Sequence, residues 1–194
     1  MQKRYSPKER TQILDLITEE ARKNDAFVGC VLVGSGAIGF SDEYSDIDIL
    51  VVVDDQQDIA HVSGTWKDHL DTLLPVLSYA EAPRADRIIL HNFYLANHLE
   101  INNCVLPQGL LSATKANYRV LWDRTGQIQD VLDTTWAENR KNNPLKTYFA
   151  GKKVAIWHYV NHGYVAIKRG NGWQALSDIE EIRQQIVHLR AYRD

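Results

Sequence analysis

The chain has 194 residues with 44% hydrophobic content, which suits one domain or one domain with a smaller helical appendage. Its formal net charge of −3 gives no general attraction to nucleic acid, and this argues against a processive polymerase or an RNA-tailing enzyme. No apolar run approaches membrane-spanning length, and residues 1–10 lack the apolar core of a signal peptide. We therefore expect a cytoplasmic protein without a membrane partner.

The N-terminal segment is predicted to be helical. Ser6-Pro7-Lys8-Glu9 is a capping box with proline at the first helical position. Apolar residues then recur at helical spacing, at Ile13, Leu14, Ile17 and Ala21. Asn24-Asp25 ends the run. We expect this opening helix to pack on a sheet.

Two apolar runs with a polar connection follow. Residues 28–33 predict a first strand that meets Gly34-Ser35, and residues 47–53 predict a second strand headed by Asp46 and Asp48. Because side chains alternate along a strand, both aspartates point to one face, where they can share a divalent cation. The Gly-Ser turn is expected to leave backbone N–H groups bare for phosphate oxygens. This combination is typical of phosphoryl or nucleotidyl transfer.

The same stretch resembles the signature of the DNA polymerase β-type nucleotidyltransferase superfamily. In that signature an apolar-Gly-Ser turn is followed, after a short spacer, by Asp-x-Asp between apolar residues, and Gly34-Ser35, Asp46 and Asp48 fill these positions. Ser45 completes a frequent form of the motif. Many members carry an arginine directly after the Gly-Ser pair, but here Gly36-Ala37 stand there, and the replacement for that contact is open. An ordinary βαβ connection with an acidic strand start is the alternative.

Residues 55–106 contain a candidate for a third acid of the site. The apolar pattern from Asp55 to Leu77 predicts one helix, and residues 87–96 and 99–106 predict two strands. Glu100 is a lone acid between apolar neighbours, and a buried unpaired carboxylate is costly. The resemblance implies a third metal carboxylate on a strand beside the Asp-x-Asp strand, and Glu100 matches it, with Asn102 on its face. The alternative is an edge-strand glutamate that faces water.

The C-terminal part is predicted to be mainly helical. Residues 118–122 predict a last strand that ends in a turn at Asp123, and residues 127–139 predict a helix. Residues 142–144 are expected to cap a long helix to about Arg169, and Asn171-Gly172 separates it from a final helix over 176–192. The fold class is therefore α/β (α+β), with a mixed sheet flanked by helices and a C-terminal helical pair. We expect a catalytic domain over 1–141 and a substrate-binding region over 142–194 that continues beyond Asp194.

Several other side chains are candidates for a site. In the family that the motif resembles, a triphosphate-contacting lysine often lies on the long helix, and Lys152 and Lys153 are there; a solvated helix face explains them equally well. His158 and His162 have the i, i+4 spacing of zinc ligands, but the sequence shows no third ligand, so we expect packing. Acids that a cationic acceptor would meet are Asp42, Glu43, Glu138 and Asp178. Cys30 and Cys104 lie in apolar runs and are expected to be reduced core thiols.

The resemblance implies a nucleotidyltransferase that uses a nucleoside triphosphate, ATP in the favoured form, and two Mg²⁺ ions. Asp46, Asp48 and Glu100 would hold the metal, and Gly34, Ser35, Ser45, Lys152 and Lys153 would bind the nucleotide. The expected acceptor is a small molecule of the aminoglycoside or lincosamide class, or a metabolite. A protein AMP-transferase of the antitoxin type and a nucleotide sensor without turnover are the alternatives. The nucleobase, the acceptor and the oligomeric state, including a homodimer, stay open.

Overall fold

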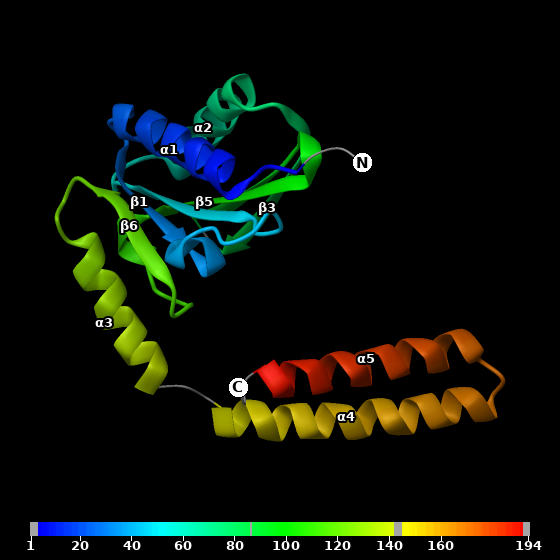
Figure 1. The fold of residues 1–194 in the computed structure, drawn as a ribbon. Coiled ribbons are helices and arrows are strands. Elements are labelled where there is room, and N and C mark those ends of the chain that lie inside the picture. The colour runs from blue at the N-terminus through cyan, green and yellow to red at the C-terminus, as the bar shows by residue number, and fades with distance from the viewer. Residues whose placement is uncertain (1–3, 86, 142–144, 192–194) are drawn as a thin grey trace. The chain divides into compact units, whose positions relative to one another are not determined.

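The computed structural model describes residues 4–85, 87–141 and 145–191, and the chain forms two compact units, Met1–Lys141 and Asn142–Asp194 (Figure 1). The elements of the first unit are α1 (Pro7–Lys23), β1 (Phe27–Val33), the 3₁₀ turn η1 (Gly34–Ile38), β2 (Ile47–Val53), α2 (Ile59–Leu73), β3 (Val76–Ala85), β4 (Ile88–Leu95), η2 (Ala96–His98), β5 (Leu99–Pro107), η3 (Gln108–Leu110), β6 (Tyr118–Asp123) and α3 (Ile128–Lys141). The second unit consists of α4 (Leu145–Lys168) and α5 (Gly172–Ala191).

The first unit is built on a mixed six-stranded sheet with the order β3-β4-β5-β2-β1-β6. β2 and β5 are parallel, whereas every other neighbouring pair in the sheet is antiparallel. The predicted fold class, a mixed sheet flanked by helices, is confirmed. The parallel pair lies in the middle of the sheet, and the strands on either side hold it in place through hydrogen bonds.

Each face of the sheet has its own hydrophobic core. One core joins α1 and α2 to the residues of β2 that include Ile47, Ile49 and Val51, and Figure 1 shows both helices on one side of the sheet. The other core joins α3 to Val52 on β2 and Leu106 on β5. Because side chains alternate along a strand, this second face also carries the side chains of Asp46 and Asp48. We call it the acid face.

The local signals at the N-terminus act as expected. Ser6 Oγ accepts a hydrogen bond from the Glu9 N–H at 3.3 Å, and the Ser6 N–H donates to Glu9 Oε2 at 2.7 Å. The capping box thus satisfies N–H groups that a helix start leaves without partners inside the helix.

Asp123 acts as the expected turn residue, because its Oδ1 accepts hydrogen bonds from the N–H groups of Thr125 and Gly126.

The prediction of one helix from Asp55 to Leu77 was wrong. α2 spans Ile59–Leu73, and Leu77 lies on β3, a strand of its own. Pro75 separates the two elements, because proline disfavours helical geometry in the residue before it and has no N–H for a helical hydrogen bond. The apolar residues at positions 73, 74, 76 and 77 fit the period of a helix as well as that of a strand. The apolar pattern alone therefore did not show where the helix ends.

The second unit is a helical hairpin. α5 begins at Gly172, four residues before the expected start, because Asn171 Oδ1 accepts a hydrogen bond from the Gln174 N–H at 3.1 Å and caps the helix. The helices approach closely at Gly163, where an added Cβ would lie 3.4 Å from the Cβ of Asp178. None of the helices in the described part of the chain has the length and apolarity needed to cross a membrane.

Candidate active site

The central feature of the acid face is the register of the parallel strands. Ile47 on β2 lies opposite Ile101 on β5, and Asp48 lies opposite Asn102. Asp46 precedes β2 by one residue, and Glu100 is the second residue of β5. Both strands therefore begin with acidic side chains on the same face of the sheet. The structure brings together the three carboxylates and the one amide that the sequence singled out.

Asn102 links the two aspartates. Its Nδ2 donates to Asp48 Oδ1 at 3.0 Å and makes a longer contact of 3.4 Å with Asp46 Oδ2. A carboxamide that donates to two carboxylates spreads part of their negative charge. The same side chain carries an oxygen that an amide rotation would present to the site instead. Asn102 thus holds the carboxylates in place.

The charges of both aspartates act on the Glu100 carboxyl. Burial raises the pKa of the Glu100 carboxyl, and the negative charges of Asp46 and Asp48 raise it further. A like charge nearby disfavours the ionised form, so this site has an excess of negative charge. In the antiparallel pair of β4 and β5, Tyr94 lies opposite Glu100.

Lys115 is a residue of the site that the sequence reading missed. Its Nζ lies 3.2 Å from Asp48 Oδ2, and the lysine side chain is 57% exposed whereas that of Asp48 is 21% exposed. Lys115 lies in the segment between η3 and β6, and 67 positions separate it from Asp48 in the sequence. Neither periodicity nor a motif marks such a contact. The ammonium group of Lys115 partly offsets the negative charge of the carboxylates.

Gly34 is required where it stands. Its φ of +75° favours glycine, and a Cβ at this position would lie 2.7 Å from Asp48 Oδ2. The expectation of bare N–H groups at the Gly-Ser turn was wrong for this residue, because the Gly34 N–H donates to the Asn117 carbonyl at 3.0 Å. Ser35 is exposed on η1, and its role toward a nucleotide stays a prediction. The glycine therefore provides close access to Asp48.

The loop before Asp46 is fixed from two sides. Asp42 Oδ1 accepts hydrogen bonds from the N–H groups of Tyr44 (2.8 Å) and Ser45 (3.0 Å), and these bonds hold the pKa of the Asp42 carboxyl below its usual range. The fully buried Arg10 donates from Nε to the Ser45 carbonyl at 2.7 Å. Ser45 is thus a structural anchor here, and its role toward a nucleotide stays a prediction.

The donor set fits a divalent cation of the magnesium type. Carboxylate oxygens are the ligands that Mg²⁺ prefers, and three of them share one face at the ends of adjacent strands. The raised pKa of Glu100 and the ammonium group of Lys115 on Asp48 both mark a place where positive charge is favoured. Within the described ranges, no group of three or more His, Cys, Asp or Glu side chains is already arranged as a metal site. Binding would therefore require Lys115 and Asn102 to adjust.

Other predicted residues lie elsewhere. Lys152 and Lys153 are on α4, but the side chains of residues 145–154 lie outside the described residues, so their role is untested. The rings of His158 and His162 lie 4.1 Å apart, and both side chains are exposed rather than packed into a core. Glu138 is exposed on α3.

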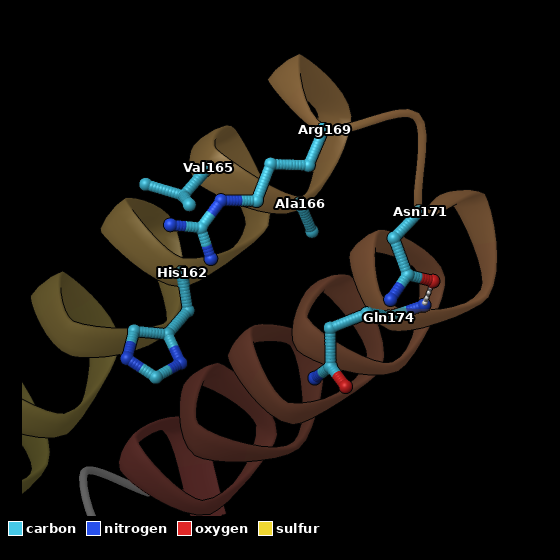
Figure 2. Close-up of a pocket in the computed structure, with 6 residues that line it drawn as sticks. All are labelled: His162, Val165, Ala166, Arg169, Asn171 and Gln174. Carbon is cyan, nitrogen blue, oxygen red and sulfur yellow. Dashed lines mark hydrogen bonds between the residues drawn. The ribbon is translucent and has the colours of Figure 1, made fainter.

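A second candidate pocket lies near the turn of the hairpin and has a volume of about 430 Å³. Figure 2 shows its lining, which consists of His162, Val165, Ala166, Arg169, Asn171 and Gln174. These side chains include a guanidinium group and an imidazole but no carboxylate, which makes the pocket unsuited to a cationic acceptor. Asp178 is 3% exposed, and its Oδ1 accepts a hydrogen bond from Gln174 Nε2 at 3.1 Å.

A match to one family model agrees with the motif. Residues 14–101 match the family model of the nucleotidyltransferase domain. A search of curated proteins finds no match. The solved Cid1 poly(U) polymerase with magnesium and 3′-dATP is similar over 51% of this chain and 30% of that chain, at 18% identity and a TM-score of 0.43. An aminoglycoside 6-adenyltransferase from Bacillus subtilis is similar over 94% of this chain and 66% of that chain, at 10% identity and a TM-score of 0.41. The chain thus spans under a third of the length of the polymerase.

Proposed function

Since residues 14–101 match the family model of the nucleotidyltransferase domain, we propose that the chain transfers a nucleoside monophosphate from ATP to a hydroxyl group of a small-molecule acceptor. The observation that carries this proposal is the shared face of Asp46, Asp48 and Glu100 at the starts of two parallel strands. The modest net charge of −3 supports a small acceptor over a nucleic acid.

The three carboxylates would hold two magnesium ions. When bound, these ions supply charge neutralisation for the triphosphate and lower the pKa of the acceptor hydroxyl. Asp46 and Asp48 would face the triphosphate, and Gly34 and Ser35 would lie beside its β- and γ-phosphates, with Lys152 and Lys153 as further candidates. Lys115 would turn its ammonium group from Asp48 to a phosphate oxygen, since opposite charges attract strongly at this short range.

Glu100 would accept the proton of the acceptor hydroxyl, because its carboxylate lies on the face that carries Asp46 and Asp48. The acceptor oxygen attacks the α-phosphorus, and a new P–O bond forms in line with the bond that breaks. The bridging oxygen between the α- and β-phosphates leaves as part of pyrophosphate. Asn102 would hold the two aspartates until the ions bind and would then adjust.

Asp48→Asn is the direct test of this assignment. The variant keeps the shape of the side chain but loses its charge, and we expect the transfer rate to fall by about 10²–10³. Pyrophosphate release and labelled-ATP transfer are measured over antibiotic, metabolite and protein acceptors, with Asp15→Asn on the exposed face of α1 as the matched control. Wild-type turnover by the Asp48→Asn protein would falsify the catalytic role.

Calorimetry with and without Mg²⁺ separates the enzyme from its alternatives. A catalytic site is expected to bind ATP with Mg²⁺ and to release pyrophosphate when a small acceptor is present. Binding without turnover on any acceptor favours a nucleotide sensor. Transfer to a protein and to none of the small molecules favours an AMP-transferase of the antitoxin type.

A further inference from the structure

The acid face changes from polar to apolar within one step along each central strand. On β2 the side chain that follows Asp48 on this face is Leu50, and on β5 Cys104 follows Asn102. Two residues along a strand advance about 6–7 Å. An aliphatic surface therefore begins directly beside the carboxylates.

A cavity of about 290 Å³ lies over this aliphatic surface. The sheet contributes Val33, Leu50 and Cys104 to its lining, and the rest includes Leu132 of α3, Leu110 and residues 112–115. Lys115 belongs to this lining and also contacts Asp48 through its Nζ. The same lysine thus borders both the cavity and the acids, so a molecule in the cavity would lie next to the catalytic carboxylates.

The chemistry of the lining is selective. Most of its side chains are aliphatic, and among the described residues that line the cavity, Lys115 is the one that carries a charge. The Tyr118 hydroxyl donates to Asp133 Oδ1 at 2.6 Å and is already engaged. An ammonium group buried among these aliphatic side chains would have no carboxylate partner in the lining, and Asp48, the acid at the border of the cavity, is already paired with Lys115. The volume lies at the lower end of ligand pockets and suits one ring-sized group.

We propose that this cavity seats an uncharged, apolar ring of the acceptor and so holds the acceptor's hydroxyl group beside Asp48. The proposal rests on the proposed transferase function and narrows its substrate to neutral, ring-bearing alcohols. Polycationic aminoglycoside-type acceptors fit this cavity poorly. The hydroxyl group reaches toward the acids while the ring covers Leu50 and Cys104.

Cysteine labelling tests occupancy without any catalytic step. Cys104 lines the cavity and is partly exposed, whereas Cys30 is fully buried and its burial raises the pKa of the thiol to about 12. N-ethylmaleimide should therefore modify Cys104 and leave Cys30 intact, as followed by mass spectrometry of the folded protein. Phenylethanol should slow labelling by about half at its dissociation constant, since it covers the thiol. Phenylethylamine, of the same size but cationic, should protect far less.

A pocket-filling variant provides a second readout. Ile88→Trp adds bulk on β4 at the cavity, and Leu77→Trp adds the same bulk on the exposed edge strand β3 as the matched control. We expect Ile88→Trp to raise the KM for phenylethanol on the order of tenfold, the scale of pocket discrimination in enzymes, with unchanged Mg-ATP binding in calorimetry. Leu77→Trp should behave as the wild type.

The outcomes distinguish this inference from the proposed function. Equal protection by alcohol and amine, or none by either, overturns the cavity assignment even if Mg-ATP binds and turns over. Protection by phenylethanol without Mg-ATP binding supports the cavity and contradicts the transferase. Labelling of Cys30 under native conditions would show that the fold had opened, so circular dichroism accompanies each reaction.

Discussion

Arg10 on α1 donates from Nε to the carbonyl oxygen of Ser45 at 2.7 Å, one residue before Asp46. A second bond runs from its Nη2 to the Glu43 carbonyl at 2.7 Å. The side chain is fully buried, and desolvation lowers the pKa of its guanidinium group. The opening helix therefore fixes the loop that delivers the first carboxylate.

Replacing Arg10 tests this anchor. Arg10→Met keeps much of the aliphatic stem but removes the buried guanidinium that donates to the Ser45 and Glu43 carbonyls, and we expect a loss of about 2–3 kcal/mol in the free energy of unfolding. Urea denaturation measures it, with Arg22→Met on the exposed part of the same helix as the control. At a temperature where the variant is folded, we also expect a lower transfer rate. An unchanged rate would show that the loop holds its shape without Arg10.

Asn102→Asp adds a further negative charge to the site. Like charges a few ångströms apart near a surface repel on the order of 1–4 kcal/mol, so the melting temperature should fall in the presence of a chelator. Mg²⁺ should restore it, because a more negative site binds a divalent cation more tightly. The control is Asn97→Asp in the η2 turn, where the positive φ tolerates aspartate. A variant whose melting temperature ignores Mg²⁺ would contradict a metal site here.

Lys115→Ala removes the ammonium group that contacts Asp48. We expect Mg-ATP binding to weaken by roughly tenfold, because a charge-assisted bond to a phosphate oxygen is lost. Titration calorimetry measures the change, and Lys141→Ala, exposed at the end of α3, is the control. Tighter Mg²⁺ binding with unchanged ATP affinity would instead mean that Lys115 merely competes with the metal.

His91 makes stability depend on pH. Its Nε2 lies 2.5 Å from Ser63 Oγ on α2, and its Nδ1 lies 2.7 Å from the Tyr79 hydroxyl group, which donates to Glu81 Oε2. Desolvation lowers the pKa of His91, and nearby Lys67 lowers it further against the opposing effect of Glu81. The folded state therefore takes up this proton less readily than the unfolded chain does.

The lowered pKa of His91 makes the folded state more stable at higher pH. The contribution of neutral His91 to the free energy of unfolding is complete above the unfolded histidine pKa of about 6.5. It is lost as the pH falls below that value towards the lower pKa of the folded state. The melting temperature of the wild type should thus drop between about pH 7.5 and pH 5.5, and the drop should be smaller in His91→Gln than in the wild type. His61→Gln, exposed on α2, should keep the wild-type slope. An identical slope in all three proteins would place the titration elsewhere.

Alternation and a short motif predicted the acids of the site. Asp46, Asp48, Glu100 and Asn102 lie on two strands, and a period of two fixes their common face once the strands are recognised. The contacts of Arg10 and Lys115 with this site could not be predicted in the same way. Their contacts join a helix and a loop to residues 35 and 67 positions away, and no periodic pattern encodes such distances.

The elements of the fold show the same division. The capping box and the apolar runs predicted α1, β1 and β2 within a residue of their bounds, because local chemistry decides them. β3 was missed because its pairing with β4 stabilises it more than its own pattern indicates. The early start of α5 at Gly172 depends on one side-chain cap, which outweighs the poor helix propensity of glycine.

The pairing of Asp48 with Asn102 also shows what guards the site against misfolding. A slip of β2 by one residue would exchange its two sides, driving carboxylates beneath α1 and α2 and pushing isoleucines into water. Burial of the apolar side chains of β2 thus fixes the register that also orients its two aspartates. The packing of Ile47, Ile49 and Val51 therefore keeps the two aspartates on the opposite face of the sheet.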